Sequence, residues 1–407
     1  MSNTEETNPD LSAPSEFIPL IVPEIRGNEW NYVKECLDTN WVSSVGSYVD
    51  RFERMVAEHV GCKYAVATVN GTAALHIALL LAGVEPDDEV LVSSLTFIAP
   101  ANAIRYVGAW PVFIDAEPKY FQFDPSAVVD FLQKDCRWDG HELRDRKNDR
   151  RVKAILPVHV LGHPVDLEPI LEVAAKYSLP VIEDATEGLG ARYRGKSLGS
   201  FGNVGCFSFN GNKIITTGGG GMLVTNDGVW AARAKYLTTQ AKDDPIEYVH
   251  HSVGYNYRLT NLLAAMGCAQ MEQLDTFVEA KREIARRYQN SLGLLAGITL
   301  PEEADWAFST FWMYTVLVDE NEAHVNSRQL LRELAAAGIQ TRPLWQPIHR
   351  SQAHSPYDGA PCPISDELYS NAISLPCSVG LSPSAQGRVI EAIKNLIGSR
   401  STLPMVR

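Results

Sequence analysis

Short apolar runs alternate with amphipathic stretches along most of the chain. The apolar runs have the length of buried strands, and the stretches between them have the spacing of helices with one buried face. The predicted strands are residues 64–69, 89–93, 110–114, 152–158, 179–184, 204–209 and 222–225, and the predicted helices are residues 72–82, 99–107, 167–177 and 229–237. This alternation indicates an α/β fold whose mostly parallel sheet is covered on both faces. Ligands of such folds bind at the carboxyl ends of the strands.

The pattern changes after residue 260. Residues 261–290 predict one long helix that bridges to a smaller C-terminal α/β domain, with a strand at 311–318 and helices at 327–337 and 384–397. We therefore expect a flexible leader at 1–17, a large domain at 18–260, and the bridging helix with the small domain at 261–407. A charged insert at about 134–151 interrupts the large domain and is typical of a solvated hairpin or loop.

Composition and charge exclude several classes of partner. The 407 residues include 36 Lys and Arg against 49 Asp and Glu, a net charge of −13, which argues against nucleic acid as a partner. The most apolar stretch, residues 73–83, is too short to span a membrane. The 7 cysteines show no C-x-x-C spacing, which argues against structural zinc and suits free thiols in a reducing cytosol. Residues 1–16 lack the pattern of a secretory signal, so we expect a cytoplasmic protein.

Candidate chemistry begins where the first predicted strand meets its helix, at Asn70, Gly71, Thr72 and Ala73. Small residues at a helix N-terminus leave backbone N–H groups free to hold a phosphate, and the helix dipole favours a negative charge there. The alternative is an ordinary N-cap.

Two further strand ends carry charged residues. Asp184 ends the strand LPVIED, and it is either a turn cap or a buried carboxylate kept ionised by a cation such as a protonated pyridine. Lys213 lies between an apolar strand and the glycines at 218–221, and it is either a surface residue or a partly desolvated nucleophile. A phosphate cradle, a strand-end Asp and a strand-end Lys together are what pyridoxal phosphate requires.

The motifs that carry these residues resemble one known family. NGTAAL (70–75), LTFIAPANAI (95–104), VIEDATEGLGARYRGKSLGSFGNVGCFSFNGNKIITTGGGGM (181–222) and GYNYRLTN (254–261) occur in the order found in the DegT/DnrJ/EryC1/StrS family of sugar aminotransferases. The resemblance runs from about residue 18 to residue 397. It implies aspartate-aminotransferase fold type I, a pyridoxal phosphate cofactor that becomes pyridoxamine phosphate during turnover, and a homodimer with shared active sites.

The resemblance also implies roles for individual residues. Lys213 is expected to be the Schiff-base lysine and Asp184 the partner of the pyridine nitrogen. The residues expected to contact the phosphate are Gly71, Thr72, Ala73 and Ser208 in the same subunit and Asn256 of a second copy. Phe97 is expected to stack on the ring unless it is plain core, and Ser208 has the alternative of merely satisfying a strand end.

Three positions depart from the common family pattern. Glu187 stands where many members have Gln, and we expect it to share a proton with the phenolic oxygen of the cofactor. Asn210, Gly211 and Asn212 replace the usual residues before the lysine, and the usual G-E-G-G is all glycine at 218–221. These departures resemble the branch that makes 4-amino-4,6-dideoxy sugar nucleotides of the bacillosamine and legionaminic type.

By this resemblance the substrates are L-glutamate and a 4-keto-6-deoxy nucleotide sugar, with a UDP-linked 2-acetamido-2,6-dideoxy-4-hexulose favoured as acceptor. Since the whole chain is acidic, the two phosphates of this substrate require local cations. The expected substrate-binding residues are Trp41, His159, Arg258, Arg342 and His349, with Arg342 and His349 preferred. Arg342 in a structural ion pair, His349 as a satisfied surface residue and Trp41 in domain packing are the alternatives. A pyridoxamine-phosphate-dependent sugar dehydratase or a non-catalytic member are the alternative functions, and the presence of Lys213 disfavours both.

Overall fold

The computed structural model describes residues 17–244, 246–355 and 359–401, so residues 1–16 of the predicted leader lie outside the described residues. None of the described helices has the length and apolarity needed to cross a bilayer.

Two groups of strands join into one central sheet. One group pairs in the order β1 (Tyr64–Thr68), β11 (Gly221–Thr225), β10 (Val204–Ser208) and β7 (Ile182–Asp184), and the other contains β3 (Trp110–Ile114), β2 (Glu89–Ser93) and β6 (Arg151–Leu156). A parallel bridge between Ile155 and Val181 connects the two groups. β11 runs antiparallel to β1 and β10, whereas the pairs β10–β7, β6–β2 and β2–β3 are parallel. The prediction of a mostly parallel sheet is confirmed.

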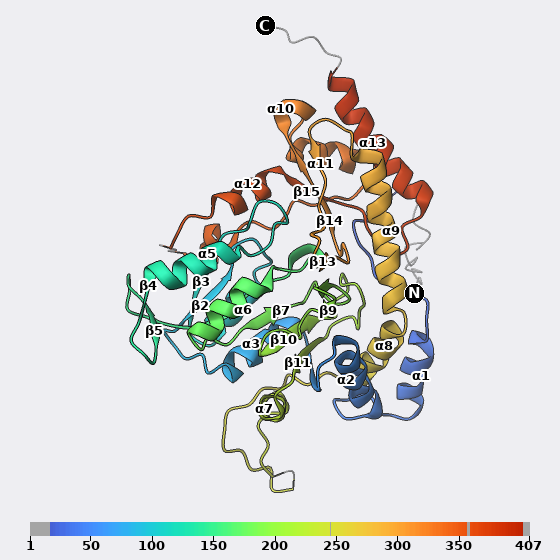
Figure 1. Ribbon diagram of the computed structural model, residues 1–407. Helices are drawn as coiled ribbons and strands as arrows, with labels where there is room; N and C mark the ends of the chain where they lie inside the picture. The colour runs from blue at the N-terminus through green and yellow to red at the C-terminus, as the bar shows by residue number, and fades with distance from the viewer. Residues whose placement is uncertain (1–16, 245, 356–358, 402–407) are drawn as a thin grey trace, which may run out of the picture.

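Helices cover both faces of this sheet (Figure 1). One face packs against α3 (Gly71–Leu81), α4 (Ala99–Tyr106) and α7 (Gly228–Thr238), and the other against α2 (Ser47–Val60), α5 (Pro125–Asp130), α6 (Leu167–Lys176) and α8 (Asn261–Met271). In β2, Val90 and Val92 belong to the core under α3 and α4, whereas Leu91 belongs to the opposite core. Strands buried on both faces read as continuous apolar runs, and this is why the sequence showed them so clearly.

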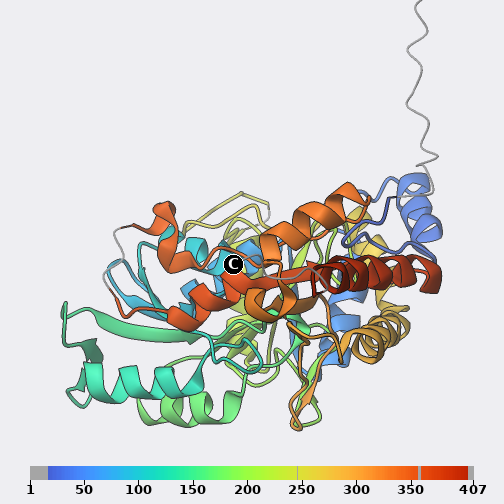
Figure 2. The ribbon, with the colours of Figure 1, turned by 90° about the horizontal axis from the view of Figure 1, so that it is seen from above.

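The C-terminal part of the chain has a hydrophobic core of its own. β12 (Ile298–Thr299), β14 (Tyr314–Val318) and β15 (Ala372–Leu375) form an antiparallel sheet, and the helices of this part are α9 (Leu274–Leu292), α10 (Glu320–Ala323), α11 (Ser327–Ala336), α12 (Pro363–Asn371) and α13 (Pro383–Ser401). Figure 2 shows α11 and α13 beside one another, and both contribute to this core with β14. The separate core supports our proposal of a small C-terminal domain.

The prediction of one long helix at 261–290 is wrong. The chain leaves the helical path between α8 and α9, at Glu272 and Gln273. α8 is buried in the large core, and its Gln270 side chain accepts a hydrogen bond from the Thr216 amide (3.1 Å) and donates one to the carbonyl of Glu24 (2.8 Å). α9 instead has one buried face, whose first turns pack in the same large core (Leu274, Phe277 and Val278) and whose later turns pack in the C-terminal core (Ile284, Tyr288 and Leu292). Neither Gly nor Pro stands at residues 271–274, so the residue types give no local signal of the break.

The charged insert forms a hairpin that belongs to the sheet. β4 (Cys136–Trp138) and β5 (Leu143–Asp145) pair antiparallel, and β5 continues the sheet along the first half of β6. Cys136 and Leu143 are buried, while Arg151 at the start of β6 forms an ion pair with Asp88 (2.7 Å). The insert is therefore anchored by apolar contacts and an ion pair rather than being fully solvated.

A tight turn after β6 brings the C-terminal part against the large domain. Leu161 and Gly162 both have positive φ (61° and 84°), and the Gly162 carbonyl accepts a hydrogen bond from the Thr310 amide (3.0 Å). A Cβ atom on Gly162 would lie 2.3 Å from Thr310 Oγ1 and 2.7 Å from the Trp312 nitrogen. The close approach of these two segments therefore requires glycine.

We expect Gly162→Ala to lower the free energy of unfolding by more than the matched variant Gly195→Ala. Gly195 has nearly the same φ (82°), but no described atom lies within 4 Å of a Cβ placed there. Positive φ alone costs alanine about 1–2 kcal/mol at either site, and the clash at Gly162 adds about 1–3 kcal/mol. Urea denaturation of both variants measures the difference, and equal losses would contradict the packing argument.

Candidate active site

The N-terminus of α3 meets the ends of two strands at the carboxyl edge of the sheet. A Cβ on Gly71 would lie 2.9 Å from Ser208 Cβ and 3.1 Å from Thr186 Cγ2, so Gly71, Thr186 and Ser208 surround one point. Ser208 ends β10 and pairs with Gly221 of β11, where a Cβ would lie 2.3 Å from the Asn70 carbonyl oxygen. Small residues on three elements therefore make a cradle at a helix N-terminus, which suits an anion.

An N-cap and an anion site are both compatible with this cradle. The Asn70 side chain accepts a hydrogen bond from the Ala73 amide (2.8 Å), which is the ordinary cap. The Ala73 amide, one of those expected to hold a phosphate, therefore already donates to the Asn70 side chain. A phosphate would have to displace Asn70 to accept a hydrogen bond from Ala73. Thr72, which is half-buried, and Gly71 stay predicted as phosphate ligands.

Asp184 ends β7 on the same edge and is buried at 2% exposure. Its Oδ1 accepts a hydrogen bond from the Thr186 amide (3.1 Å). Burial raises the pKa of Asp184, while the hydrogen bonds from Thr186 and the charge of Lys213 act in the opposite direction. A carboxylate in this position favours a cationic group nearby.

Lys213 follows β10 and points back toward the buried carboxylates. Its Nζ lies 3.7 Å from Glu187 Oε1 and 4.4 Å from the centre of the Trp312 ring, and its side chain is 13% exposed. The alternative of an ordinary surface lysine is therefore wrong. A partly desolvated amine beside a carboxylate and an aromatic face has the surroundings of a nucleophile.

Glu187 is held between Lys213 and the turn after β6. Its Oε2 accepts a hydrogen bond from the Leu161 amide (2.8 Å). Burial raises the pKa of Glu187 to about 7, against the opposing effects of Lys213 and the Leu161 amide. Near neutral pH this group can therefore both donate and accept a proton.

Phe97 and Asn256 lie at the surface. Phe97 follows β2 and is 55% exposed, so the alternative of a plain core residue is wrong. Asn256 is exposed and its backbone bridges to Thr239. Both side chains are accessible to a ligand or a second copy, and their roles stay predictions.

The structure contradicts two of the expected substrate residues. His159 is fully buried, and its Nε2 lies 3.2 Å from Glu183 Oε2 while its Nδ1 accepts from the Val165 amide (3.0 Å). Arg258 is buried in an ion pair with Glu53 and donates to the Ala67 carbonyl (3.2 Å). Each side chain is committed to internal partners, so both predictions of substrate contact are wrong.

The remaining expected substrate residues are accessible to different degrees. Arg342 is exposed, and its described side-chain partner is the Thr341 carbonyl (3.1 Å) rather than a carboxylate. His349 is half-buried, with Ser94 Oγ at 2.7 Å from Nδ1 and Asp366 Oδ1 at 3.4 Å from Nε2. Trp41 is 56% exposed, so domain packing does not cover it. These geometries favour Arg342 over His349 as a ligand for phosphate.

Two residues beside Lys213 and Gly71 were missed in the sequence. Trp312 lies within an apolar run that reads as strand and core, and no local signal distinguishes it. Thr186 lies inside the motif DATEG, so its position between the Asp and the Glu was a usable signal.

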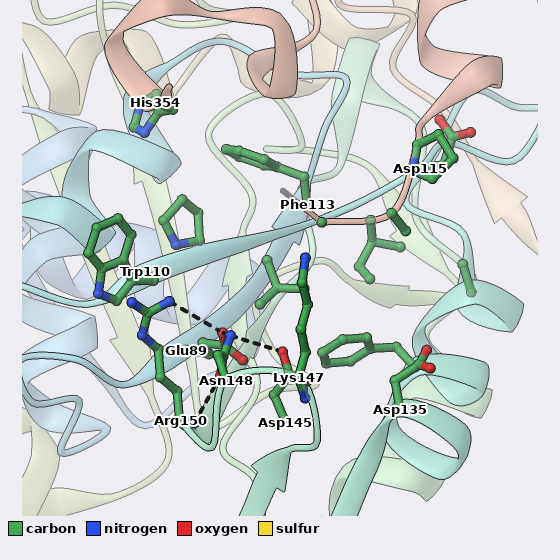
Figure 3. Close-up of a pocket in the computed structure, with 18 of the residues that line it drawn as sticks. Glu89, Trp110, Phe113, Asp115, Asp135, Asp145, Lys147, Asn148, Arg150 and His354 are labelled. Carbon is green, nitrogen blue, oxygen red and sulfur yellow. Dashed lines mark hydrogen bonds and ion pairs between the residues drawn. The ribbon is translucent and has the colours of Figure 1, made fainter. Parts of the chain in front are cut away.

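A separate cavity of about 880 Å³ lies beside the edge strand β3 (Figure 3). Arg150 stacks over the Trp110 ring (4.5 Å) and forms an ion pair with Glu89 (4.0 Å), and Asn148 also donates to Glu89 (2.6 Å). The lining residues come from the start of β2, the whole length of β3, the segment 127–135 that includes α5, the loop of the hairpin at 145–150 and the loop before α12, and they do not include Lys213, Asp184 or Glu187. This cavity is therefore not part of the candidate active site.

Comparison with known proteins gives one consistent result. Residues 23–394 match the model of the DegT/DnrJ/EryC1/StrS aminotransferase family. The chain is 40% identical to the GDP-perosamine synthase of Caulobacter vibrioides over 93% of this chain and 98% of that protein. It is 39% identical to the putative pyridoxal phosphate-dependent aminotransferase EpsN of Bacillus subtilis, over 93% and 95% of the two chains. The crystal structure of the aminotransferase TlmJ from Streptoalloteichus hindustanus superposes with a TM-score of 0.85, at 28% identity, over 95% of this chain and 100% of that one.

We expect Glu187 to make the stability of the cofactor-free protein depend on pH. Its folded pKa of about 7 lies above the ordinary value of 4.5, so the folded state binds more protons between these values. Stability from this group is therefore present below about pH 4.5 and is lost as pH rises through 7, by about 3 kcal/mol at most.

Glu187→Gln removes this titration while keeping the shape of the side chain. Denaturation in urea between pH 4.5 and 8 should show the wild-type protein losing stability relative to the variant as pH rises. Parallel curves for the two proteins would show that Glu187 does not titrate in this range.

Proposed function

The chain belongs to the DegT/DnrJ/EryC1/StrS aminotransferase family, and on this premise we propose that it transfers an amino group from L-glutamate to C4 of a 4-keto-6-deoxy nucleotide sugar. The observation that carries the proposal is Lys213, whose amine points from a strand end toward the buried Glu187 and within electrostatic reach of Asp184. We infer a role in making amino sugars of surface glycans, of which bacillosamine-type and legionaminic-type sugars are examples.

The residues at this edge fit pyridoxal phosphate, the cofactor of the family. The cradle of Gly71, Thr186 and Ser208 suits its phosphate, and the buried Asp184 suits a protonated ring nitrogen. When bound, the cofactor supplies an aldehyde that condenses with amines and a ring that withdraws electrons from the attached carbon.

The side chains then divide the proton transfers. Lys213 Nζ would hold the cofactor through its aldehyde carbon, and as a free amine Nζ would accept and return the proton that amino transfer requires. Glu187, with a pKa of about 7 and 3.7 Å from Nζ, can take up or return a proton as the charge on Lys213 changes. Asp184, buried at the end of β7, would hold the protonated ring nitrogen.

The sugar nucleotide needs a local cation, because the chain carries a net charge of −13. Arg342 is the best candidate, since its exposed guanidinium has no described carboxylate partner. His349 bonds to Ser94 just after β2 and would orient this loop beside the substrate. Two relatives, from Caulobacter vibrioides and Escherichia coli O157:H7, are named GDP-perosamine synthases. GDP-linked acceptors should therefore be tested beside the UDP-linked ones.

We also propose that the working unit is a homodimer. Phe97, which follows β2, and Asn256, two residues before the bridge of Arg258 to Thr68 at the end of β1, are both exposed, so a second copy can reach them. Asn256 would then reach the phosphate bound by the partner copy.

The test is turnover of a panel of UDP-linked and GDP-linked 4-keto-6-deoxy sugars with L-glutamate, with products identified by NMR. We expect Lys213→Ala to lower kcat by at least about 10²–10⁴-fold, because it removes both the nucleophile and the proton carrier. Lys235→Ala, an exposed lysine of α7, is the matched control and should keep wild-type turnover. Full turnover by Lys213→Ala would overturn the mechanism, and failure of every sugar would favour the dehydratase or the non-catalytic alternative.

Arg342→Ala should raise KM for the nucleotide sugar by about 10- to 100-fold and change KM for glutamate little, because it removes one charged contact to a phosphate. Arg332→Ala, an exposed arginine of α11, is the control and should leave both constants unchanged. If both arginine variants behave as wild type, residues other than Arg342 bind the phosphates of the nucleotide sugar.

A further inference from the structure

Trp312 lies against Lys213 although nothing in the proposed chemistry requires a tryptophan there. Lys213 Nζ sits 4.4 Å from the centre of its ring, and the side chain is buried at 3% exposure. Tryptophan is the strongest aromatic partner for an ammonium group, and a desolvated contact of this kind is stronger than an exposed one. The ring therefore defines one face of the space in which the free amine rests.

The ring itself is fixed from two sides. Its Nε1 donates a hydrogen bond to the Asn212 carbonyl (2.7 Å), which joins it to the residue before Lys213. The Trp312 carbonyl accepts a hydrogen bond from Lys281 Nζ (2.8 Å), and Lys281 also donates to the Cys377 carbonyl. Trp312 is thus tied to the loop that carries Lys213 and to the bridging helix α9.

Lys281 is an unusual choice for this position. It is buried at 2% exposure, and its described partners are two carbonyls and the Cys377 sulfur (3.6 Å) rather than a carboxylate. Burial lowers its pKa. Burying an amine whose described partners include no carboxylate costs free energy. The hydrogen bonds of Lys281 explain its presence if they hold α9, Trp312 and Cys377 in one arrangement.

The segment of Trp312 also touches the turn that binds Glu187. The Trp312 nitrogen packs on Gly162, and the neighbouring Leu161 donates its amide to Glu187 Oε2 (2.8 Å). The segment before β14 therefore contacts the surroundings of both partners of the Lys213–Glu187 pair. Trp312 belongs to the core on one face of the large sheet, whereas its neighbour Phe311 belongs to the C-terminal core, so this segment joins the two cores beside the candidate site.

We propose that Trp312 is a positioning residue for Lys213, and that Lys281 holds Trp312 in place from the bridging helix. Holding the amine at one point lowers the loss of freedom needed to reach the reacting carbon. The proposal rests on the proposed function, because it assumes that Lys213 captures pyridoxal phosphate.

The experiment measures covalent capture of pyridoxal phosphate by the cofactor-free protein. The rate is followed by absorbance after mixing, and borohydride trapping with mass spectrometry identifies the modified lysine. We expect Trp312→Leu to slow capture about tenfold and Trp312→Phe, which keeps a ring but loses the bond to Asn212, to slow it about threefold. Lys281→Met should slow capture although the ring is still present.

Trp306→Leu is the matched control. Trp306 packs against Tyr193 and His163 and should lower the melting temperature without changing the capture rate. Melting temperatures of all variants separate positioning from general destabilisation, since a purely structural role would make the capture rate follow the melting temperature.

The outcomes distinguish the two proposals. If the wild-type protein does not trap pyridoxal phosphate on Lys213, the proposed function itself is overturned. If the wild type does trap it and the Trp312 variants that fold capture it at the wild-type rate, only the positioning role is overturned. Should Trp312→Leu fail to fold, the Trp312→Phe and Lys281→Met rates decide the question.

Discussion

Glu183, Asp184 and Glu187 are all buried where β7 ends, and the surrounding structure is arranged to satisfy them. Glu183 accepts hydrogen bonds from the amides of Gly199, Phe201 and Gly202 and contacts His159. Asp184 accepts a hydrogen bond from the Thr186 amide. Glu187 accepts one from the Leu161 amide and forms an ion pair with Lys213. Buried carboxylates are costly without such partners. The satisfaction of these groups therefore fixes the loops at the carboxyl edge of the sheet.

Two of these carboxylates have different roles: Glu183 supports the site from behind, and Glu187 is part of the site. Since His159 Nδ1 accepts from the Val165 amide, its Nε2 is left to donate to Glu183. The pair joins the loop after β6 to the loop before β10, which lies behind Asp184. Glu187, by contrast, is bonded by one amide and faces the only cationic group described as its ion-pair partner, Lys213. Burial is the main cause of the raised pKa of Glu187, and Lys213 and the Leu161 amide oppose it.

The C-terminal part completes the site by packing rather than by local sequence. Gly162 lets residues 310–312 approach the turn after β6, and Lys281 connects α9 to the same segment. Trp312 reaches Lys213 across about 100 residues of chain, as its hydrogen bond to Asn212 illustrates. A movement of the C-terminal part would therefore shift Trp312 and with it the surroundings of Lys213. These contacts connect the two cores of the chain.

The amino-acid sequence was enough to predict the alternation of strands and helices, the family motifs, and the positions of Asp184, Glu187 and Lys213 after strands. Strands buried on both faces appear in the sequence as continuous apolar runs, and the residues that follow such runs can be identified from their position alone. The break between α8 and α9, the burial of His159 and Arg258, and the contact of Trp312 with Lys213 became visible in the folded structure alone. Each of these depends on partners far away along the chain, and residue type and spacing do not encode which distant groups a side chain will meet.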